Sequence, residues 1–382
     1  MPPDSGNYSQ TATTLFSLEP TLANELKSLG AQNVKVGNRA VTYEADKAFM
    51  YRANLSLRTA LRILVPLKSF AAKTEEQLYN KVRSIQWDEH LSLGKTFMVD
   101  TVVNSPHFTH SHYVALKVKD AIVDQFRDKT GERPSIDLEN PSVRINVYID
   151  DSECIISLDS SGDSLHRRNY RVETIEAPIN EVLAAGMVLL SGWDGKSSFT
   201  DPMCGSGTIL IEAAMYARNI APGVHRHDFG FTTWHDFDED LWKSIRSEVR
   251  QQKRDIDFPI IGADKSPKAL NFARKNITTA GLEEDIRLSN KSFQRREPST
   301  EEGTLIMNPP YGERMKEEDI NEFYSQIGDA LKNYYAGHTA WILSANKDAL
   351  KHIGLRTSKR YTLYNGPLKC KYHKYEMYKG SR

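Results

Sequence analysis

The fold of this chain is indicated by the stretch FTDPMCGSGTILIEAAMYA, residues 199–217. A short apolar run ends in Asp201, a turn with two glycines follows, and an apolar helical pattern begins directly at Thr208. Gly205 and Gly207 tolerate positive φ and allow a ligand to approach the backbone closely. The stretch therefore predicts a parallel strand, a tight ligand-binding turn and a helix packed on the sheet.

The turn lacks the marks of two common nucleotide sites. It has no Gly-Lys-Ser/Thr, which excludes a P-loop for nucleotide phosphates. It has no third glycine at the dinucleotide-binding spacing, and Asp201 would repel a pyrophosphate. A carboxylate beside bare backbone amides instead suits a zwitterion with an ammonium, a carboxylate and a cationic sulfur, such as S-adenosylmethionine. The alternative is an ordinary strand-turn-helix crossing whose glycines serve only the turn.

Two further motifs follow later strands of the same alternating pattern. Asp264, in IIGADKSP, ends the next strand, where a carboxylate can accept both hydroxyls of a ribose; the alternative is a plain helix N-cap. Asn308-Pro309-Pro310-Tyr311 follows the apolar run TLIM, and its two prolines predict a stiff, extended turn. Because ligands bind outside the carboxyl ends of parallel strands, we expect all three motifs to share one site.

The tetrapeptide has the chemistry to hold a planar amine. The side-chain oxygen of Asn308 and the carbonyl of Pro309 can each accept a hydrogen bond from an exocyclic amine, and Tyr311 offers a ring for stacking. Two acceptors would turn the lone pair of the amine toward a sulfonium methyl group, so that the rate comes from alignment. We therefore expect catalytic roles for Asn308, Pro309, Pro310 and Tyr311; the alternative is a proline-stiffened turn without chemistry.

Composition allows two or three domains, since the chain has 382 residues of which 39% are hydrophobic. The formal net charge is zero, but the last 32 residues carry nine Lys and Arg against one acidic residue. Five tyrosines are interleaved there: Tyr361, Tyr364, Tyr372, Tyr375 and Tyr378. Cations mixed with flat rings suit phosphate contact and base stacking. The alternative is a solvated edge hairpin whose lysines block aggregation.

Several other classes of protein are disfavoured. The three cysteines show no CxxC pattern, the N-terminus lacks a signal-peptide pattern, and no apolar run is long enough to span a membrane. We therefore expect a cytoplasmic protein without a membrane segment. His107, His110 and His112 are close in sequence, but no Cys or further His accompanies them, so we expect no metal.

The order of predicted elements divides the chain. Residues up to about 165 read as two α+β units with small antiparallel sheets and helices on one face. From about residue 177, strands alternate with helices, which predicts a doubly wound parallel sheet. The chain then predicts an antiparallel hairpin through Asn365-Gly366. Residues 230–252 form an insertion whose aromatic residues Phe231, Trp234 and Trp242 are expected to pack onto that parallel sheet.

Long motifs resemble a known family. DPMCGSGTILIEAAMYARNIAPG (201–223), NPPYGER (308–314) and SLHRRNYR (164–171) are similar to the THUMP-domain class I RNA methyltransferases, and most closely to the ribosomal large-subunit RNA guanine-N2 methyltransferase branch. SHYVALKVKDAIVDQFR (111–127) and LYNGPLKCKYHKY (363–375) extend the resemblance over nearly the whole chain. It implies an α/β fold: a Rossmann-like, seven-stranded methyltransferase domain (166–382), preceded by an α+β ferredoxin-like domain (1–69) and a THUMP RNA-binding domain (70–165).

The resemblance also implies roles for individual residues. Asp201, Pro202, Met203, Gly205, Gly207 and Thr208 would hold the methionine end of S-adenosylmethionine, and Asp264 with Lys265 its ribose. The family usually places an Asp after the third strand to meet the adenine amine; here Asn290 or Ser292 must serve, with Phe293 packing on the ring. Arg167, Arg168 and Arg171 would make phosphate or interdomain contacts, and Lys369 and Lys371 would bind RNA.

The implied activity is S-adenosylmethionine-dependent methylation of the N2 amine of a guanosine in 23S ribosomal RNA or a precursor particle, with the target base flipped out or unpaired. The alternatives are the same reaction on transfer RNA and methylation of adenine N6 in RNA. A DNA adenine methyltransferase is disfavoured, because such an enzyme would normally carry a DNA target-recognition domain. A non-catalytic RNA-binding factor would show a damaged cofactor turn or tetrapeptide, and both are intact in this sequence.

Overall fold

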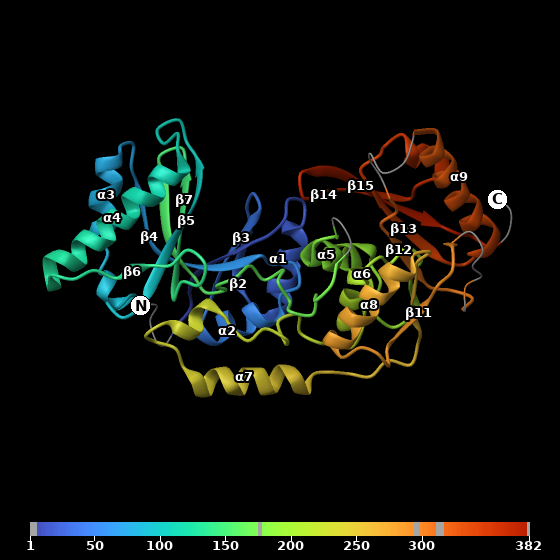
Figure 1. Ribbon diagram of the computed structural model, residues 1–382, viewed down its shortest axis with the longest axis horizontal. Coiled ribbons are helices and arrows are strands. Elements are labelled where there is room, and N and C mark those ends of the chain that lie inside the picture. Colours follow the sequence, from blue (N-terminus) through green and yellow to red (C-terminus); the bar gives the residue numbers. More distant parts are fainter. Residues whose placement is uncertain (1–5, 175–177, 294–297, 299, 311–316, 380–382) are drawn as a thin grey trace.

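The computed structural model describes residues 6–174, 178–293, 298, 300–310 and 317–379. The described chain is elongated, and its three parts do not follow one another in sequence order along the long axis (Figure 1). The N-terminal residues, in blue, lie in the middle. Residues of about 72–159, from blue to green, form one end, and residues of about 180–220 and 260–379 form the other, while the yellow segment between the last two ranges runs back beneath the middle.

Residues 8–159 form one continuous eight-stranded sheet, so the expectation of separate small sheets is wrong. Its strands are β1 (Tyr8–Thr13), β2 (Gln32–Val36), β3 (Ala40–Ala45), β4 (Arg62–Ala71), β5 (Thr96–Asn104), β6 (Ser135–Ile136), β7 (Val143–Asp150) and β8 (Glu153–Asp159), in the order β2-β3-β1-β4-β8-β7-β5-β6. β4 joins the N-terminal strands β1–β3 to the strands β5–β8, because its first residues pair with β1 and residues from Leu64 to Ala71 pair with β8, with a register shift between Pro66 and Lys68.

The pairing in this sheet is antiparallel except at β5, which runs parallel to β6 and β7. The expectation of purely antiparallel pairing is wrong here, because a 20-residue helix, α4 (Ser111–Thr130), carries the chain back before β7 begins. The other helices of this half are α1 (Glu19–Leu29), α2 (Lys47–Ser56) and α3 (Glu75–Arg83). Local sequence sets their ends: Asp46 accepts a hydrogen bond from the Phe49 N–H at 2.7 Å, and Gly131 ends α4 in the left-handed conformation.

The second sheet has seven strands, as expected. They are β9 (Phe199–Asp201), β10 (Ile260–Ala263), β11 (Ile286–Ser289), β12 (Thr304–Met307), β13 (Thr339–Ser344), β14 (Lys359–Asn365) and β15 (Leu368–Glu376), in the order β11-β10-β9-β12-β13-β15-β14. The first five are parallel, and β15 runs antiparallel to both β13 and β14. The order reverses beside β9, so the turn after β9 opens at the switch point where ligands bind in such sheets.

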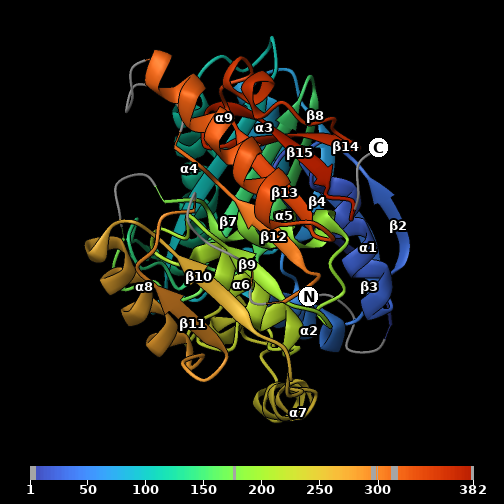
Figure 2. The same cartoon turned by 90° about the vertical axis from the view of Figure 1, so that its right-hand side faces the viewer.

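Helices cover both faces of the second sheet (Figure 2). They are α5 (Glu181–Ser191), α6 (Thr208–Ala217), α8 (Pro267–Ala280) and α9 (Glu317–Tyr334). Apolar residues of α5, α6 and α8 share one buried cluster, which includes Trp341 and Tyr372 of the sheet. Residues of α9 share the other cluster, which includes Met307 and Tyr375. The doubly wound prediction is therefore confirmed.

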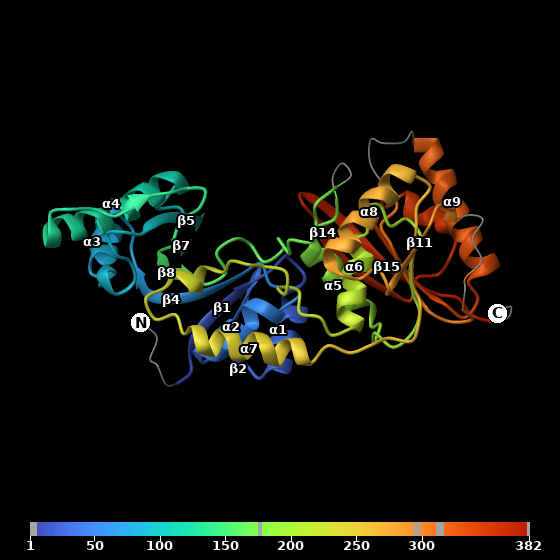
Figure 3. The same cartoon turned by 60° about the horizontal axis from the view of Figure 1, so that its bottom comes forward.

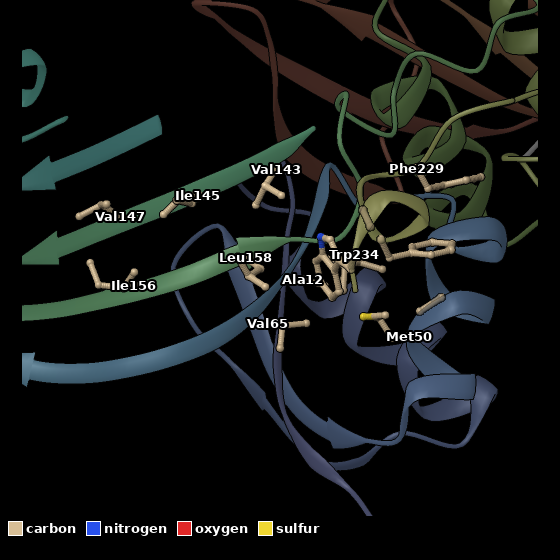
Figure 4. Close-up of a cluster of buried hydrophobic side chains, with 14 of the residues drawn as sticks. Ala12, Met50, Val65, Val143, Ile145, Val147, Ile156, Leu158, Phe229 and Trp234 are labelled. Carbon is tan, nitrogen blue, oxygen red and sulfur yellow. The ribbon is translucent and has the colours of Figure 1, made fainter. Parts of the chain in front are cut away.

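The insertion at 230–252 does not pack onto the parallel sheet. It contains a 3₁₀ turn (Gly230–Thr233) and α7 (Glu239–Gln251), which runs beneath the N-terminal elements in Figure 3. Tyr51 of α2 stacks on Phe231 with ring centroids 4.4 Å apart and meets Trp242 at 5.9 Å. Figure 4 shows Phe229 and Trp234 in the same buried cluster as Met50. The expectation is wrong because the best apolar surface for these rings belongs to the other half of the chain.

Buried arginines also join the two halves. Arg58, in the loop after α2, donates to the carbonyls of Met215 (3.2 Å) and Ile220 (2.8 Å) at the end of α6. Arg168 donates to Glu212 of α6 at 3.0 Å and to the Arg58 carbonyl at 2.6 Å. Charges this deeply buried are tolerated only when they are paired and hydrogen-bonded. We infer that the N-terminal and C-terminal halves form one unit at this interface.

Candidate functional site

The structure brings the three sequence motifs together in one cavity of about 460 Å³, a size typical of small-ligand sites. The cavity opens beyond the carboxyl ends of β9, β10 and β12. Most of the predicted site residues line it: Asp201, Pro202, Met203, Gly205, Thr208, Asp264, Lys265, Ser292, Phe293, Asn308, Pro309 and Pro310. Tyr311 lies outside the described residues, so its stacking role stays a prediction.

The glycine turn is fixed to the neighbouring strand by its backbone. Gly205 has a φ of +54°, and its N–H donates to the Asp264 carboxylate at 3.0 Å. The other carboxylate oxygen accepts from the Ser266 N–H at 2.9 Å. Ser266, not Asp264, caps α8, so the plain N-cap alternative for Asp264 is wrong. The Asp264 carboxylate thus holds the turn in place and retains lone pairs for a ligand hydroxyl.

Gly207 has a role in shaping the turn itself. It does not line the cavity, and a Cβ added there would meet the Cβ of Ala273 on α8 at 3.3 Å. Its φ is +85°, which favours glycine. Gly207 therefore permits the turn and the close approach of α6 to α8, and a direct contact between Gly207 and the cofactor stays a prediction.

Asp201 is a buried carboxyl at the wall of the cavity. One oxygen accepts a hydrogen bond from the Met203 N–H at 3.1 Å. Burial raises the pKa of the Asp201 carboxyl to about 8, against the smaller opposing effect of that hydrogen bond, and the charge of Asp264 raises it further. A cationic group bound next to Asp201 would restore its charged form.

The tetrapeptide end of the cavity holds an unused acceptor. The side-chain oxygen of Asn308 is buried and has no hydrogen-bond partner within the described part of the chain. The Pro310 carbonyl accepts from the Tyr324 hydroxyl at 3.4 Å, and that hydroxyl lies 2.7 Å from the Ser344 hydroxyl. A buried polar atom without a partner is costly, so the oxygen of Asn308 is poised for a ligand donor.

The loop after β11 distinguishes between Asn290 and Ser292. Ser292 and Phe293 line the cavity, whereas Asn290 is exposed and donates to the Asp264 carbonyl at 3.0 Å. Phe293 is buried and stacks on Tyr335, with centroids 5.5 Å apart. The geometry favours Ser292 as the residue facing a ligand here, and Asn290 as a support for Asp264.

Other cavity residues were not predicted from the sequence. They are Pro178, Ile179, Cys204, Ser206, Ile209, Lys291, Phe323, Asn365 and Leu368. Asn365 and Leu368 flank the turn of the β14–β15 hairpin, which therefore reaches the cavity. The sequence around these two residues predicts a hairpin, but it does not indicate which other loop the turn of the hairpin contacts.

Asn276, in the middle of α8, was also missed. It is buried, and its side-chain oxygen accepts from the N–H groups of Val172 (3.0 Å) and Glu173 (3.1 Å). Its amide nitrogen donates to the carbonyls of Glu173 (2.8 Å) and Ser206 (3.0 Å). The side chain of Asn276 thus links residues 172–173 to the glycine turn at Ser206.

We expect Asn276→Ala to weaken binding of S-adenosylhomocysteine about tenfold, since it removes four hydrogen bonds of roughly 1 kcal/mol each, and only the part of this energy that orders the turn contributes to ligand affinity. Isothermal titration calorimetry would measure the affinity. Lys275→Ala is the matched control, because Lys275 also contacts Glu173, but through an exposed ion pair of 2.8 Å. Equal affinities for the two variants would contradict a positioning role for Asn276.

The three arginines of 167–171 behave differently. Arg168 is 2% exposed and spends its donors on Glu212, Leu165 and Arg58, so RNA contact is wrong for it and the interdomain alternative holds. Arg171 pairs with Glu181 at 3.0 Å and donates to Thr208 at 3.0 Å, which supports the cavity wall. Arg167 is exposed, with an ion pair to Asp163, and its RNA role stays a prediction.

The basic C-terminal tyrosines are not all available to stack on bases. Tyr372 and Tyr375 are fully buried, and Tyr361 stacks on Trp341 at 5.8 Å. The expectation is wrong for these three because the hairpin belongs to the sheet core. Lys369 is exposed, and Lys371 donates to Thr362 at 2.8 Å.

Two features bear on metals and membranes. His107, His110 and His112 line a separate cavity of about 540 Å³ near the start of α4. No group of three or more His, Cys, Asp or Glu side chains suited to a metal ion occurs within residues that the structure describes. None of the helices in the described ranges combines the length and apolar character needed to cross a bilayer.

Comparisons with known proteins agree with this architecture. The family model described as RMKL-like, methyltransferase domain, matches residues 168–374, more than half of the chain. A THUMP-domain model matches residues 72–159, and a model described as RlmL ferredoxin-like domain matches residues 10–64.

Curated relatives match over nearly the whole chain. A Synechocystis protein named "Putative RNA methyltransferase slr0064" is 42% identical, covering 98% of this chain and 100% of that protein. Proteins named "Ribosomal RNA large subunit methyltransferase K/L", from Syntrophotalea carbinolica and Methylococcus capsulatus, are each 40% identical over 94% of this chain. This chain spans only about half of these two relatives, 52% and 50% of their lengths.

Solved structures confirm the fold. SMU.472, described as "a putative methyltransferase complexed with SAH", superposes with a TM-score of 0.89 at 31% identity, covering 99% of this chain and 100% of that one. TrmN from Thermus thermophilus shares the fold alone, with a TM-score of 0.70 at 20% identity over 97% and 99% of the two chains. The resemblance seen in the motifs is thus confirmed, and the chain belongs to the family of RMKL-like methyltransferases, with ferredoxin-like and THUMP domains before the methyltransferase domain.

Proposed function

We propose that this protein transfers a methyl group from S-adenosylmethionine to the N2 amine of a guanosine in large-subunit ribosomal RNA. The observation that carries the proposal is the buried oxygen of Asn308, which has no hydrogen-bond partner among the described residues and lies in the same cavity as the glycine turn. The names of the K/L relatives support ribosomal RNA as the substrate class. We further propose a cytoplasmic location, 23S RNA or its precursor particle as partner, and domain limits of 1–69, 70–165 and 166–382.

The cavity fits the cofactor by its donor set. Asp201 supplies a buried carboxyl for an ammonium, Asp264 retains acceptor capacity for a ribose, and Ser292 with Phe293 supplies a polar atom and an apolar ring at the third strand. The cofactor, when bound, supplies an electrophilic methyl group. The protein supplies no strong base at Asn308, and an exocyclic amine needs none before transfer, because it can lose its proton afterwards.

The residues of the tetrapeptide act by orientation. The Asn308 oxygen accepts one N–H of the target amine, and the Pro309 carbonyl is proposed to accept the other. Tyr324 holds the Pro310 carbonyl from the side of α9, so the tetrapeptide resists movement when a base enters. Fixed acceptors keep the nitrogen lone pair directed at the methyl carbon, which is how positioning lowers the barrier.

Cofactor binding should depend on pH through Asp201. Because the pKa of Asp201 is raised to about 8, this carboxyl is mostly protonated at neutral pH and must release its proton to pair with an ammonium. Affinity for S-adenosylhomocysteine should therefore rise about tenfold per pH unit between roughly pH 6 and 7.5. Calorimetry in two buffers of different ionisation enthalpy should detect nearly one proton released.

Asp201→Asn is the control for this pH dependence. The variant cannot titrate at this position, so its weaker affinity should change little over the same pH range. An unaltered pH dependence in Asp201→Asn would assign the proton to another group.

The raised pKa of Asp201 also affects the folding stability of the protein without ligand. The contribution of this carboxyl to stability is fully present below its unfolded pKa of about 3.9 and is lost as pH rises through about 8.

Mass spectrometry of nucleosides tests the substrate and the atom. A strain lacking the protein should lose N2-methylguanosine from large-subunit ribosomal RNA and regain it on expression of the wild type. Loss from transfer RNA would favour the same chemistry on that substrate, and loss of N6-methyladenosine would favour adenine. Unchanged levels of all three would overturn the proposal.

A further inference from the structure

The terminal hairpin has two faces, which the strand register separates. Three opposed pairs, Arg360 with His373, Thr362 with Lys371 and Tyr364 with Lys369, lie on one face because opposed residues point the same way and the period is two. Lys371 donates to Thr362 at 2.8 Å, as the shared face requires. We call Arg360, Tyr364, Lys369 and Lys371, together with Phe16, the basic face.

The opposite face of the hairpin is packed. It carries Tyr361, Leu363, Cys370 and Tyr372, which belong to or pack against the buried cluster of α5, α6 and α8. The Tyr372 hydroxyl donates to the Met187 carbonyl of α5 at 3.1 Å. This side anchors the hairpin along its length. On the other side Tyr375 packs into the cluster of α9, and Arg360, Lys369 and Lys371 occupy the part of that face nearer the turn.

The cations of the basic face form no ion pair with a carboxylate among the residues that the structure describes. Within the described part of the chain, no carboxylate lies within 4 Å of Arg360, Lys369 or Lys371, whereas Lys374 on the packed side pairs with Glu376 at 2.7 Å. Burial lowers the pKa of His373 to about 4, and the charges of Arg360 and Lys371 lower it further. The basic face is thus a local region of positive potential that suits an anionic partner.

The same face carries aromatic surface. Phe16, from the loop between β1 and α1, is 45% exposed and meets the ring of Tyr364 edge-on at 5.3 Å. An exposed phenylalanine that contacts Tyr364, whose opposed residue is Lys369, suits stacking on a nucleobase together with contact to phosphates. Bases of a duplex are already stacked, so this combination favours a single strand.

The basic face borders the tetrapeptide. Lys371 on β15 lies opposite Ser344 on β13, and Ser344 contacts Tyr324, which donates to the Pro310 carbonyl. Asn365 and Leu368 line the cavity, and this opposed pair lies on the other face, directly next to the pair of Tyr364 and Lys369 at the turn. A strand lying on the basic face would therefore reach the end of the cavity where Asn308 lies.

We propose that the basic face binds the single-stranded RNA segment adjoining the target nucleotide, with phosphates at Arg360, Lys369 and Lys371 and a base on Phe16 and Tyr364. The proposal rests on the proposed function, which it extends from the target base to its flanking nucleotides. It also gives the N-terminal half a direct part in substrate binding, because Phe16 belongs to that half.

Fluorescence anisotropy of labelled decauridylate, over a series of KCl concentrations, tests the cations. The triple variant Arg360→Gln/Lys369→Gln/Lys371→Gln should bind more weakly, and its salt dependence, the slope of log K against log[KCl], should be shallower by about 2, since each single-strand phosphate contact contributes roughly 0.7. The matched control, Lys35→Gln/Lys243→Gln/Lys253→Gln, removes the same charge from exposed lysines elsewhere. Equal slopes in both triple variants would overturn the proposal.

Phe16→Ala and Tyr364→Ala test the rings. Each should weaken decauridylate binding about fivefold or more while leaving the salt slope unchanged. Calorimetry with S-adenosylhomocysteine reports whether each variant retains its fold at the site. An equal loss of affinity for a ten-base-pair RNA duplex would overturn the single-strand assignment.

Failure of this proposal differs from failure of the proposed function. A wild type that methylates ribosomal RNA but binds decauridylate independently of the basic face would overturn only the proposal made here. A wild type that binds through the basic face but leaves the guanosine N2 unmodified would overturn the proposed function and retain the surface.

Discussion

Replacing Asn308 by alanine is expected to lower kcat for methyl transfer by about 10²–10³-fold or more, while the affinity for S-adenosylhomocysteine stays within about twofold of the wild type. The rate estimate follows from the loss of one fixed hydrogen-bonding group that aligns the reacting atom. The side chain borders the cavity from the tetrapeptide, whereas the cofactor is expected to be held mainly by the turns after β9 and β10. Single-turnover methylation and calorimetry would measure the two quantities.

Two further variants sharpen this test. Asn308→Asp keeps an acceptor at the same position and should retain more activity than the alanine variant. Asn333→Ala removes an exposed asparagine of α9 outside the cavity, and its rate should match the wild type. Turnover in Asn308→Ala equal to that in Asn333→Ala would show that Asn308 has no part in the reaction.

Replacing Arg168 by methionine is expected to lower the free energy of unfolding by about 3–5 kcal/mol. The change leaves the carboxylate of Glu212 buried without its cation, and breaking a buried pair from one side typically has this cost. The Arg58 carbonyl also loses its donor at the interface between the two halves. Urea unfolding followed by tryptophan fluorescence would measure the change.

Arg167→Met and a double variant separate the contributions. Arg167 forms an exposed ion pair with Asp163, so its loss should cost only about 0–1 kcal/mol. Arg168→Met/Glu212→Gln removes the unpaired charge and keeps an oxygen for the Tyr170 hydroxyl, which now lies 2.9 Å from Glu212, so stability should partly recover. A stability of Arg168→Met equal to that of Arg167→Met would contradict the structural role of the buried pair.

The sequence predicts the cavity well because its main parts are local signals. Asp201 ends its strand, Asp264 and Asn308 directly follow theirs, and parallel strands present those ends at the same edge. The order of motifs is therefore enough to predict that they meet. Asn276 gives no such signal, because a polar residue in an amphipathic helix usually faces solvent, and its partners lie about a hundred residues earlier in the chain.

The exposure of individual arginines and tyrosines was harder to predict from the sequence. Arg167 and Arg168 are chemically identical neighbours, and only tertiary packing makes one exposed and the other buried. The burial of individual hairpin tyrosines could not be predicted, because the local sequence does not show that helices cover both faces of the sheet. Tyr372 and Tyr375 lie three residues apart, on opposite faces, and both are buried for that reason.

Strand β4 is shared by the ferredoxin-like and THUMP domains, so no boundary between separate sheets divides these two domains. Family models for the ferredoxin-like and THUMP domains stop at residue 64 and resume at residue 72, yet β4 runs from Arg62 to Ala71 through that gap. Removing either domain would leave one edge of β4 without its partner strand and would expose unpaired backbone amides and carbonyls. A truncation that removes one of the two domains should therefore destabilise the other.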